Sequence, residues 1–382
     1  MKIKTRPLLV LWHRWFGLLA GLWIVALAAT GSAIVFYDEL DRALNPDLHK
    51  VKAGAEPLPI KTLISAATTY KPDAFVRFIN MPNDPGSSIR LSLGARPDAS
   101  HSDADGLSLY LDPYTANIIG ERRAGELRLD RRHVMNVIYE LHIDFLLGQT
   151  VFWLLGLVAF LWLIDHFISL IISFKKLSKW AKSFKIRFSS GGYKRLFDLH
   201  RAGGLWLFPI TLMLTVSGLY FNWYDTVTHA VDKVSPLTPR TIFTLPNIGQ
   251  STVDTPIDLA SAMSLASEAS ASGRINMASF LPHKGVFEVR AFDARDIDPY
   301  GRQMIVIDAQ NGAVLSNRHI TEGGAGNVFI AWQYPLHSGK AFGWAGRIVI
   351  FITGLMIILL CVTGIKIAWR KRAAVRQKLQ GC

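Results

Sequence analysis

The sequence predicts a membrane α-helical protein: a four-helix transmembrane bundle, built from a tandem repeat, with two small α+β modules outside the membrane. Half of the 382 residues (50%) are hydrophobic, and the mean hydropathy of +0.24 is high for a soluble protein. Four apolar stretches are long enough to cross a bilayer. The motif His-Arg-x-x-Gly in the first stretch recurs in the third, at His13 and His200, which indicates a duplicated chain.

The four predicted spans cover residues 8–36, 142–174, 200–221 and 337–369. The first has the basic start and small-residue end of a secretory signal. Its apolar core is too long for one, however, and His13 and Arg14 interrupt it, so we expect an uncleaved anchor. The third span contains Pro209, which predicts a kink.

Basic residues set the expected orientation. The loop 175–199 carries eight Lys and Arg residues from Lys175 to Arg195, with no acid before Asp198, and the tail 370–382 is also basic. Lys2 and Lys4 precede the first span. The positive-inside rule places these segments and both termini in the cytoplasm of a bacterial inner membrane. This topology explains the net charge of +13, so nucleic acid is not an expected partner, whereas membrane lipid is.

The segments 37–141 and 222–336 then lie in the periplasm, and they resemble each other. Each predicts a helix after a proline, at residues 58–67 and 255–263. Each continues with alternating strand patterns, at 88–93 and 285–290, and ends in a hairpin pattern, at 109–120 and 305–315. We therefore expect one small α+β module in each segment.

One histidine lies near the start of each predicted span. The topology places His13 and His200 toward the cytoplasm, and His142 and His337 toward the periplasm. Two neutral imidazoles that face each other across a helix bundle make a bis-histidine axial site for haem iron. The repeat thus predicts four iron ligands in two pairs. The alternative is that these histidines cap helices or reach to the membrane surface.

Small residues lie where each pair would need space. Gly31 and Gly218 follow His13 and His200 by five helical turns, about 27 Å, and so reach the depth of the other pair. Gly354 follows His337 at a spacing that returns it to nearly the same face, at the depth of the cytoplasmic pair. Since no Cys-x-x-Cys-His motif is present, we expect two b-type haems held without covalent bonds. Two cysteines, Cys361 and Cys382, are too few for a four-cysteine iron–sulfur site.

Further residues near these depths are candidates for cofactor binding. His166 has no counterpart in the repeat; it could replace His13 or His200 as a ligand, bind a propionate, or serve a quinol site. Arg14 and Arg201 follow the cytoplasmic histidines and could pair with propionates or simply anchor the topology. Arg347 could bind a propionate or form a salt bridge with Glu140 or Asp144.

The remaining histidines show no metal-ligand spacing, and we expect most of them to face solvent: His49, His101, His133, His229, His283 and His319. The sequence also lacks a Walker motif, GxGxxG, GxSxG and HExxH. It therefore gives no indication of nucleotide binding or hydrolysis.

These motifs make the chain similar to the PepSY-associated transmembrane family over nearly its whole length. The features that match are the His-Arg-x-x-Gly starts, the Leu-His starts at His142 and His337, and the module endings at Asp112 and Asp308. The resemblance implies PepSY-like modules in the periplasm and, in one branch of the family, reduction of ferric siderophores by two bound b haems. PepSY modules elsewhere regulate peptidases. Asn117 occupies a position at which many such modules have Gly; in the second module the equivalent residue is Gly312.

Together these observations lead us to expect a ferric-siderophore reductase. Electrons would enter from quinol or a cytoplasmic reductase, cross between the two haems and reduce a ferric siderophore in the periplasm, releasing Fe(II). One alternative is a cytochrome b subunit that serves a periplasmic partner enzyme. Another is a haem-free regulatory or binding protein that acts through its PepSY-like modules. The sequence leaves the siderophore, the donor and the oligomeric state open.

Overall fold

The computed structural model describes residues 5–82, 84–98, 103–174, 176–189, 191–248 and 252–380. The predictions that concern Lys2, Lys4, His101, Lys175 and Cys382 lie outside these residues. The chain divides into two compact units. The bundle unit comprises Met1–Phe36, Ile138–Ala230 and Gln333–Cys382, and the sheet unit comprises Tyr37–Val137 and Val231–Trp332.

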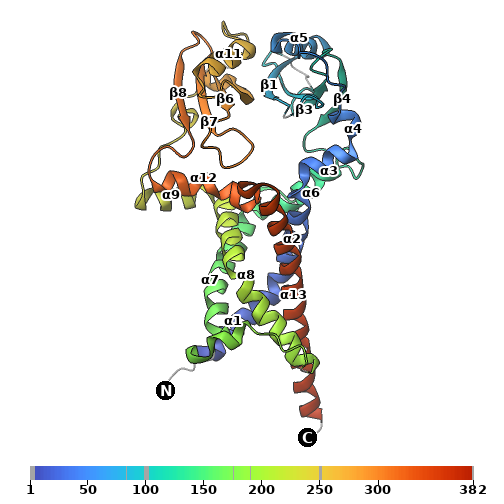
Figure 1. The fold of residues 1–382 in the computed structure, drawn as a ribbon, viewed down its shortest axis with the longest axis vertical. Helices are drawn as coiled ribbons and strands as arrows, with labels where there is room; N and C mark the ends of the chain where they lie inside the picture. The colour runs from blue at the N-terminus through green and yellow to red at the C-terminus, as the bar shows by residue number, and fades with distance from the viewer. Residues whose placement is uncertain are drawn as a thin grey trace. The chain divides into compact units, whose positions relative to one another are not determined.

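Apolar helices form the bundle unit (Figure 1). Three of them are long and apolar enough to cross a membrane, and a bent pair makes up to four spans. This confirms a membrane helical protein. The three long helices are α7 (Gln149–Ser173), α8 (Gly192–Asn222) and α13 (Gly343–Gln380), and the bent pair is α1 (Thr5–Leu19) with α2 (Gly21–Ile34). In the loop before α8, a 3₁₀ helix runs over Leu177–Phe184.

The first predicted span is bent by 55° between α1 and α2. Gly17 and Gly21 flank the break at Ala20, and neither has a heavy atom within 4 Å of the position a Cβ would take. Glycine weakens a helix interior because it has more conformational freedom to lose, and helix kinks often occur where it is present. The bend therefore lies where two glycines lower the helix propensity of the chain.

His142 and His337 do not lie on the long helices. They are near the ends of two short helices, α6 (Val134–Ile143) and α12 (Ala325–His337). After α6 the chain turns through Phe145 and Leu146, both at positive φ, before α7 begins. After α12 it passes through a 3₁₀ turn, Lys340–Phe342, before α13. These breaks remove the continuous helix on which the expected position of Gly354 depended.

The helices pack in pairs, with α2 against α13, α7 against α8, and α1 against α7 (Figure 1). A small apolar core of Ala20, Ile24 and Ile357 lies between them, and Trp162 and Leu214 pack against it. Many other large apolar side chains of the bundle are exposed. In a membrane these side chains contact lipid, where exposed apolar surface has no cost.

The sheet unit is built on one eight-stranded antiparallel sheet with the order β4-β3-β2-β1-β5-β6-β7-β8. In Figure 1 the strands of the first half are blue to green and those of the second half are orange. The first half contains β1 (Ala74–Asn80), β2 (Ile89–Ala95), β3 (Leu107–Leu111) and β4 (Ile118–Arg123). The second half contains β5 (Ile275–Leu281), β6 (Val286–Ala291), β7 (Gln303–Asp308) and β8 (Val314–His319).

The two halves are joined where β1 pairs with β5, with Ile79 opposite Ala278. The sequence predicted two modules; the structure shows that their strands form one sheet. An unpaired edge strand exposes its backbone N–H and C=O groups. Pairing β1 with β5 removes two such edges, which explains why the halves join here. The symmetric strand order is consistent with a tandem repeat, which itself stays a prediction.

Two helices, α5 (Ile60–Tyr70) and α11 (Leu259–Ala269), pack on the sheet and share one hydrophobic core that includes residues from both halves. Both helices were predicted from the sequence and are confirmed, as are β2, β6 and the two hairpins β3–β4 and β7–β8. The strands β1 and β5 were not predicted. The unit also contains α3 (Tyr37–Leu44), α4 (Pro46–His49) and α10 (Thr241–Thr244). A last helix, α9 (Tyr224–Val234), follows α8.

A buried ion network ties α3 to the first half of the sheet. Arg122 donates to both carboxylate oxygens of Asp41 at 2.9 Å, and His49 contacts the same carboxylate at 2.8 Å. Burial raises the pKa of Asp41, but the hydrogen bonds from His49 and Arg122 outweigh it and leave the pKa below its usual value. Nearby, burial and the charge of Asp41 raise the pKa of Tyr37 to about 12.

Candidate cofactor site in the helix bundle

The structure brings His13 of α1 and His200 of α8 together as the first pair. Their ring centroids lie 6.0 Å apart, with an angle of 56° between the ring planes. His13 donates from Nδ1 to the carboxylate of Asp165 on α7, at 2.8 and 3.1 Å. His200 donates from Nδ1 to the carbonyl of Leu360 on α13, at 3.0 Å. A neighbouring helix thus orients each ring.

His142 and His337 form the second pair, with ring centroids 6.3 Å apart and an interplanar angle of 61°. His142 donates from Nδ1 to the carbonyl of Leu27 on α2, at 3.1 Å, and Thr30 Oγ1 lies at the same distance. His337 donates from Nδ1 to Ser217 Oγ on α8, at 2.7 Å. The pairing expected from the sequence is therefore the pairing that the fold produces.

The hydroxyl partners fix the direction of these hydrogen bonds. Ser217 donates its own proton to the backbone of α8, at 2.9 Å from Met213 O, so toward His337 it can only accept. Thr30 likewise donates to Ala26 O at 2.8 Å. A third hydroxyl, on Thr363, lies 3.1 Å from Nδ1 of His200 and donates to its own helix.

All four rings therefore carry their proton on Nδ1, which leaves the lone pair of Nε2 free to bind a metal. Within the described parts of the chain, no side chain or backbone group hydrogen-bonds to Nε2 of these four histidines. A metal–imidazole bond of about 2 Å on each side separates two ring centroids by roughly 6 Å across one ion. Both pairs match this separation, so the residues present fit a bis-histidine metal site.

Two glycines lie directly against the paired rings. A Cβ on Gly31 would lie 2.8 Å from Cε1 of His142, and one on Gly364 would lie 3.0 Å from Cε1 of His200. Gly218 has nothing within 4 Å of its Cβ position, so it borders open space. Gly31 therefore lies beside the expected pair. The expectation for Gly354 is wrong, because its Cβ position meets Ser32 of α2.

His166 makes two hydrogen bonds inside the bundle and is only 5% exposed. Its Nδ1 lies 2.8 Å from Trp162 O, and its Nε2 lies 3.0 Å from Thr211 Oγ1. Both ring nitrogens are therefore used within the protein. Among the described residues, Nε2 of His166 thus has a protein partner, unlike Nε2 of the four paired histidines.

The three candidate arginines differ in their partners. Arg201 donates to the backbone of Ser183 and to Asp198, so it holds the basic loop against α8. Arg347 donates to Val35 O at 2.8 and 3.0 Å, at the end of α2. Arg14 stacks on Trp15, at 5.4 Å, and its Nε is buried without a hydrogen-bond partner. Of the three, Arg14 has a donor left over for an anionic group.

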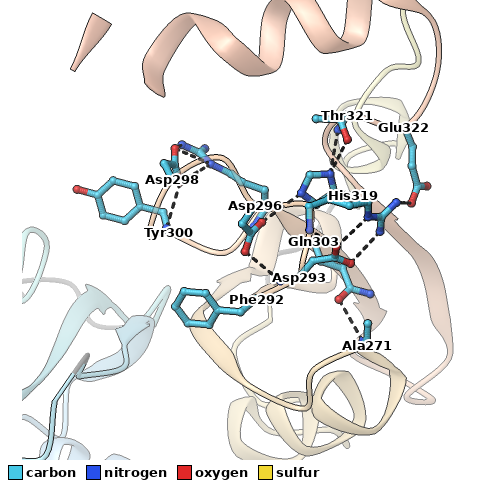
Figure 2. A network of polar contacts seen from close by, with 12 residues as sticks. Ala271, Phe292, Asp293, Asp296, Asp298, Tyr300, Gln303, His319, Thr321 and Glu322 are labelled. Carbon is cyan, nitrogen blue, oxygen red and sulfur yellow. Dashed lines mark hydrogen bonds and ion pairs between the residues drawn. The ribbon is translucent and has the colours of Figure 1, made fainter. Parts of the chain in front are cut away.

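A second polar cluster lies in the sheet unit, where the loop between β6 and β7 contacts His319 at the end of β8 (Figure 2). His319 is fully buried, and its ring contacts Thr321 at 2.7 Å and Asp296 at 3.1 Å. The side-chain hydrogen bond from Arg295 holds the pKa of Asp293 well below its usual range. Arginine and carboxylate side chains of the cluster form ion pairs with each other, and these pairs hold the loop in place. No group of three potential metal ligands occurs in the described residues.

Two histidines outside the pairs were expected to face solvent but do not. His319 is 0% exposed and His133 is 5% exposed. An acidic neighbour offsets the burial of each ring, Asp296 for His319 and Asp130, at 2.7 Å, for His133. A hydropathy scale treats every histidine as polar and contains no information about acidic neighbours, so it could not predict the burial of these two rings.

The acceptors of Nδ1 are residues that the sequence analysis did not identify, although a signal was present. Three hydroxyl residues that contact the rings each precede a glycine, as Thr30-Gly31, Ser217-Gly218 and Thr363-Gly364. In α7 the position that matches Thr363, at the spacing between His142 and His337, is Ile168. Here Asp165 supplies the acceptor instead. A search for hydroxyl–glycine pairs would have found three of the four acceptor sites.

Comparison with known families agrees with this architecture. The family model of the PepSY-associated TM region matches residues 10–372, which is nearly the whole chain, and the chain therefore belongs to this family. No curated protein matched the chain.

Proposed function

We propose that the protein is a di-haem, b-type inner-membrane reductase that passes electrons across the membrane to a ferric siderophore in the periplasm and releases iron as Fe(II). The observation that carries the proposal is the geometry of the two histidine pairs. Each pair has the ring separation of a bis-histidine site, and each ring donates from Nδ1 to a neighbouring helix. Buried histidines with a purely structural role normally have hydrogen-bond partners at both ring nitrogens, whereas these four have none at Nε2 among the described residues.

Two b-type haems, when bound, supply one-electron sites at two depths of the bundle. His13 and His200 would hold the first, and His142 and His337 would hold the second. Arg14, with its unpartnered Nε, is suited to an anionic edge of the first group. Gly31 lets the ring of His142 approach α2 closely, and Gly218 keeps the neighbouring surface of α8 open.

The orientation comes from charge. The loop before α8 and the C-terminal part of α13, from Arg370 onward, are basic. The rule that basic segments stay inside supports a cytoplasmic location for both. The first pair then faces the cytoplasm, toward a donor such as quinol or a cytoplasmic reductase. The second pair faces the periplasm, toward the substrate. The sheet unit, which mixes both charges, lies in the periplasm.

Reduction alone releases the iron. Siderophores bind ferric iron through hard oxygen ligands, which hold ferrous iron much more weakly. An electron delivered to the ferric complex therefore lowers its stability, and the protein requires no acid or base catalyst for this step. In this proposal the paired histidines act as metal ligands and not as acid or base catalysts.

The first test is the visible spectrum of protein purified in mild detergent with haem supplied during expression. Wild type should bind two haems, and His13→Ala, His200→Ala, His142→Ala and His337→Ala should each lose one. His166→Ala and His229→Ala, the latter on an exposed surface of α9, should keep both. A wild type without a Soret band, or a His13→Ala variant that keeps both haems, would refute the proposal.

The second test addresses the reaction. Reduced protein mixed with a ferric hydroxamate should be reoxidised while a ferrous chelator captures Fe(II). The isolated protein must do this without a partner. If two haems are present but no Fe(II) forms, the protein is instead an electron-transfer subunit for a periplasmic enzyme.

A further inference from the structure

One of the four paired histidines has a charged partner. Nδ1 of His13 donates to Asp165, whose carboxylate is 4% exposed and lies on α7. In the described parts of the chain, no lysine or arginine forms an ion pair with this carboxylate. Its only ion-pair partner there is His13 itself. The aspartate is therefore a buried negative charge that acts through one imidazole.

The other three histidines have neutral acceptors. Leu27 and Leu360 offer backbone carbonyls to His142 and His200, and Ser217 offers a hydroxyl to His337. The first pair thus has a carboxylate in contact with a ring. Among the residues that the structure describes, no carboxylate hydrogen-bonds to a ring of the second pair. The two sites are alike in their ligands and different in the charge behind them.

A negative charge next to a metal ligand favours the more highly charged, oxidised state of the metal and so lowers its reduction potential. We infer that Asp165 makes the first site the lower-potential site of the two. This inference rests on the proposed function. An electron on the first site then moves to the second with a favourable free energy, the first being oxidised as the second is reduced. Asp165 is in this sense a positioning residue that sets the direction of transfer toward the periplasm.

The size of the effect follows from the charge and its distance. The carboxylate lies one imidazole ring away from the metal position, and the effective dielectric constant in protein is about 20. At such a distance one unit charge changes the reduction equilibrium between roughly tenfold and a hundredfold. A tenfold change corresponds to about 59 mV for one electron.

The test is a potentiometric titration, followed by absorbance, of variants that keep one site. His142→Ala keeps only the first site, and His13→Ala keeps only the second. The midpoint of the first should lie below that of the second. Asp165→Asn, made in the His142→Ala background, keeps an oxygen acceptor for Nδ1 and removes the charge. It should raise the midpoint of the first site by at least about 59 mV, a tenfold change in the equilibrium.

Two control variants separate charge from packing. Asp225→Asn, an exposed carboxylate on α9, should leave the first site's midpoint unchanged in the His142→Ala background. Asp165→Glu keeps the charge and should keep the low midpoint.

The outcomes distinguish this inference from the proposed function. A wild-type protein without haem overturns both. Two haems with an Asp165→Asn midpoint equal to that of the parent overturn the inference and leave the reductase intact. If Asp165→Asn fails to bind haem, the midpoints of the two single-site variants, His142→Ala and His13→Ala, test the inference. A first site at or above the potential of the second overturns the inference.

Discussion

Replacing Gly31 with alanine should weaken cofactor binding at the second histidine pair and leave the first pair unchanged. The new Cβ would lie 2.8 Å from Cε1 of His142 and 3.3 Å from its Nδ1, whereas ordinary contacts begin at 3.4 Å. The ring must therefore retreat by about 0.6 Å. A metal site tolerates changes of only about 0.2 Å in its ligand distances. The shift also strains the hydrogen bond from Nδ1 to Leu27 O.

The magnitude follows from two contributions. Crowding of a packed contact costs about 1–3 kcal/mol, part of which relaxation of the ring relieves. Disturbing the group that orients a metal-binding histidine lowers metal affinity by about 10- to 100-fold, which is roughly 1.4–2.8 kcal/mol. We therefore expect Gly31→Ala to lose haem from the second site about 10- to 100-fold more readily than wild type.

Gly218 provides the matched control. It follows His200 at the spacing at which Gly31 follows His13, but its Cβ position has no heavy atom within 4 Å. The assay measures the haem-to-protein ratio and the transfer of haem to an excess of apomyoglobin. Gly31→Ala should release one haem quickly, and Gly218→Ala should behave as wild type. Equal retention in Gly31→Ala and wild type would show that the contact with His142 does not support the site.

Three further predictions concern stability. Arg122→Leu should destabilise the protein by about 3–5 kcal/mol, seen as a lower midpoint of chemical unfolding, because it removes the bidentate arginine and leaves, among the described residues, only the ion pair with His49 to offset the buried carboxylate charge of Asp41. The pKa of Asp41 is lower in the folded protein than in the unfolded chain, where it is about 4. The stability that this difference contributes is complete above about pH 4 and is lost as the pH falls through the native pKa. In Asp41→Asn the free energy of unfolding should therefore depend less on pH in that range. Gly354→Ala should cost about 1–3 kcal/mol in thermal unfolding, because its Cβ meets Ser32 across the α2–α13 contact, whereas Gly204→Ala, with nothing within 4 Å, should be neutral in packing.

Much of the sheet unit could be predicted because its signals are local. A proline before an apolar stretch predicted α5 and α11, and turn residues predicted the hairpins at the ends of both halves. The central strands were missed. In β1 an exposed arginine, Arg77, interrupts the pattern, and the strand is stabilised by pairing with β5, about two hundred residues away in the chain. Such pairing depends on tertiary structure that a local pattern does not encode.

In the bundle unit, topology was sufficient to predict which histidines meet. Once His13 and His200 belong to one membrane face, and His142 and His337 to the other, only two close pairs are possible. The helix breaks were not predictable in the same way. Phe145 and Leu146 adopt positive φ, which bulky residues rarely do, so composition gives no indication of the turn before α7. The expectation for Gly354 failed at the equivalent break, the 3₁₀ turn Lys340–Phe342 between α12 and α13, because it assumed a continuous helix from His337.

The groups that hydrogen-bond to the paired histidines are similar at three of the rings and different at the fourth, and a repeated pattern in the sequence predicts only the similar ones. Hydroxyl–glycine pairs recur on α2, α8 and α13, and each places a hydroxyl near one ring. On α7 the matching hydroxyl is absent and Asp165 takes its place. A symmetric pair of sites would share one potential and give electron transfer no preferred direction. In the proposed reductase, Asp165 is therefore the difference by which two otherwise similar sites acquire a direction of transfer, and the single-site potentials test it.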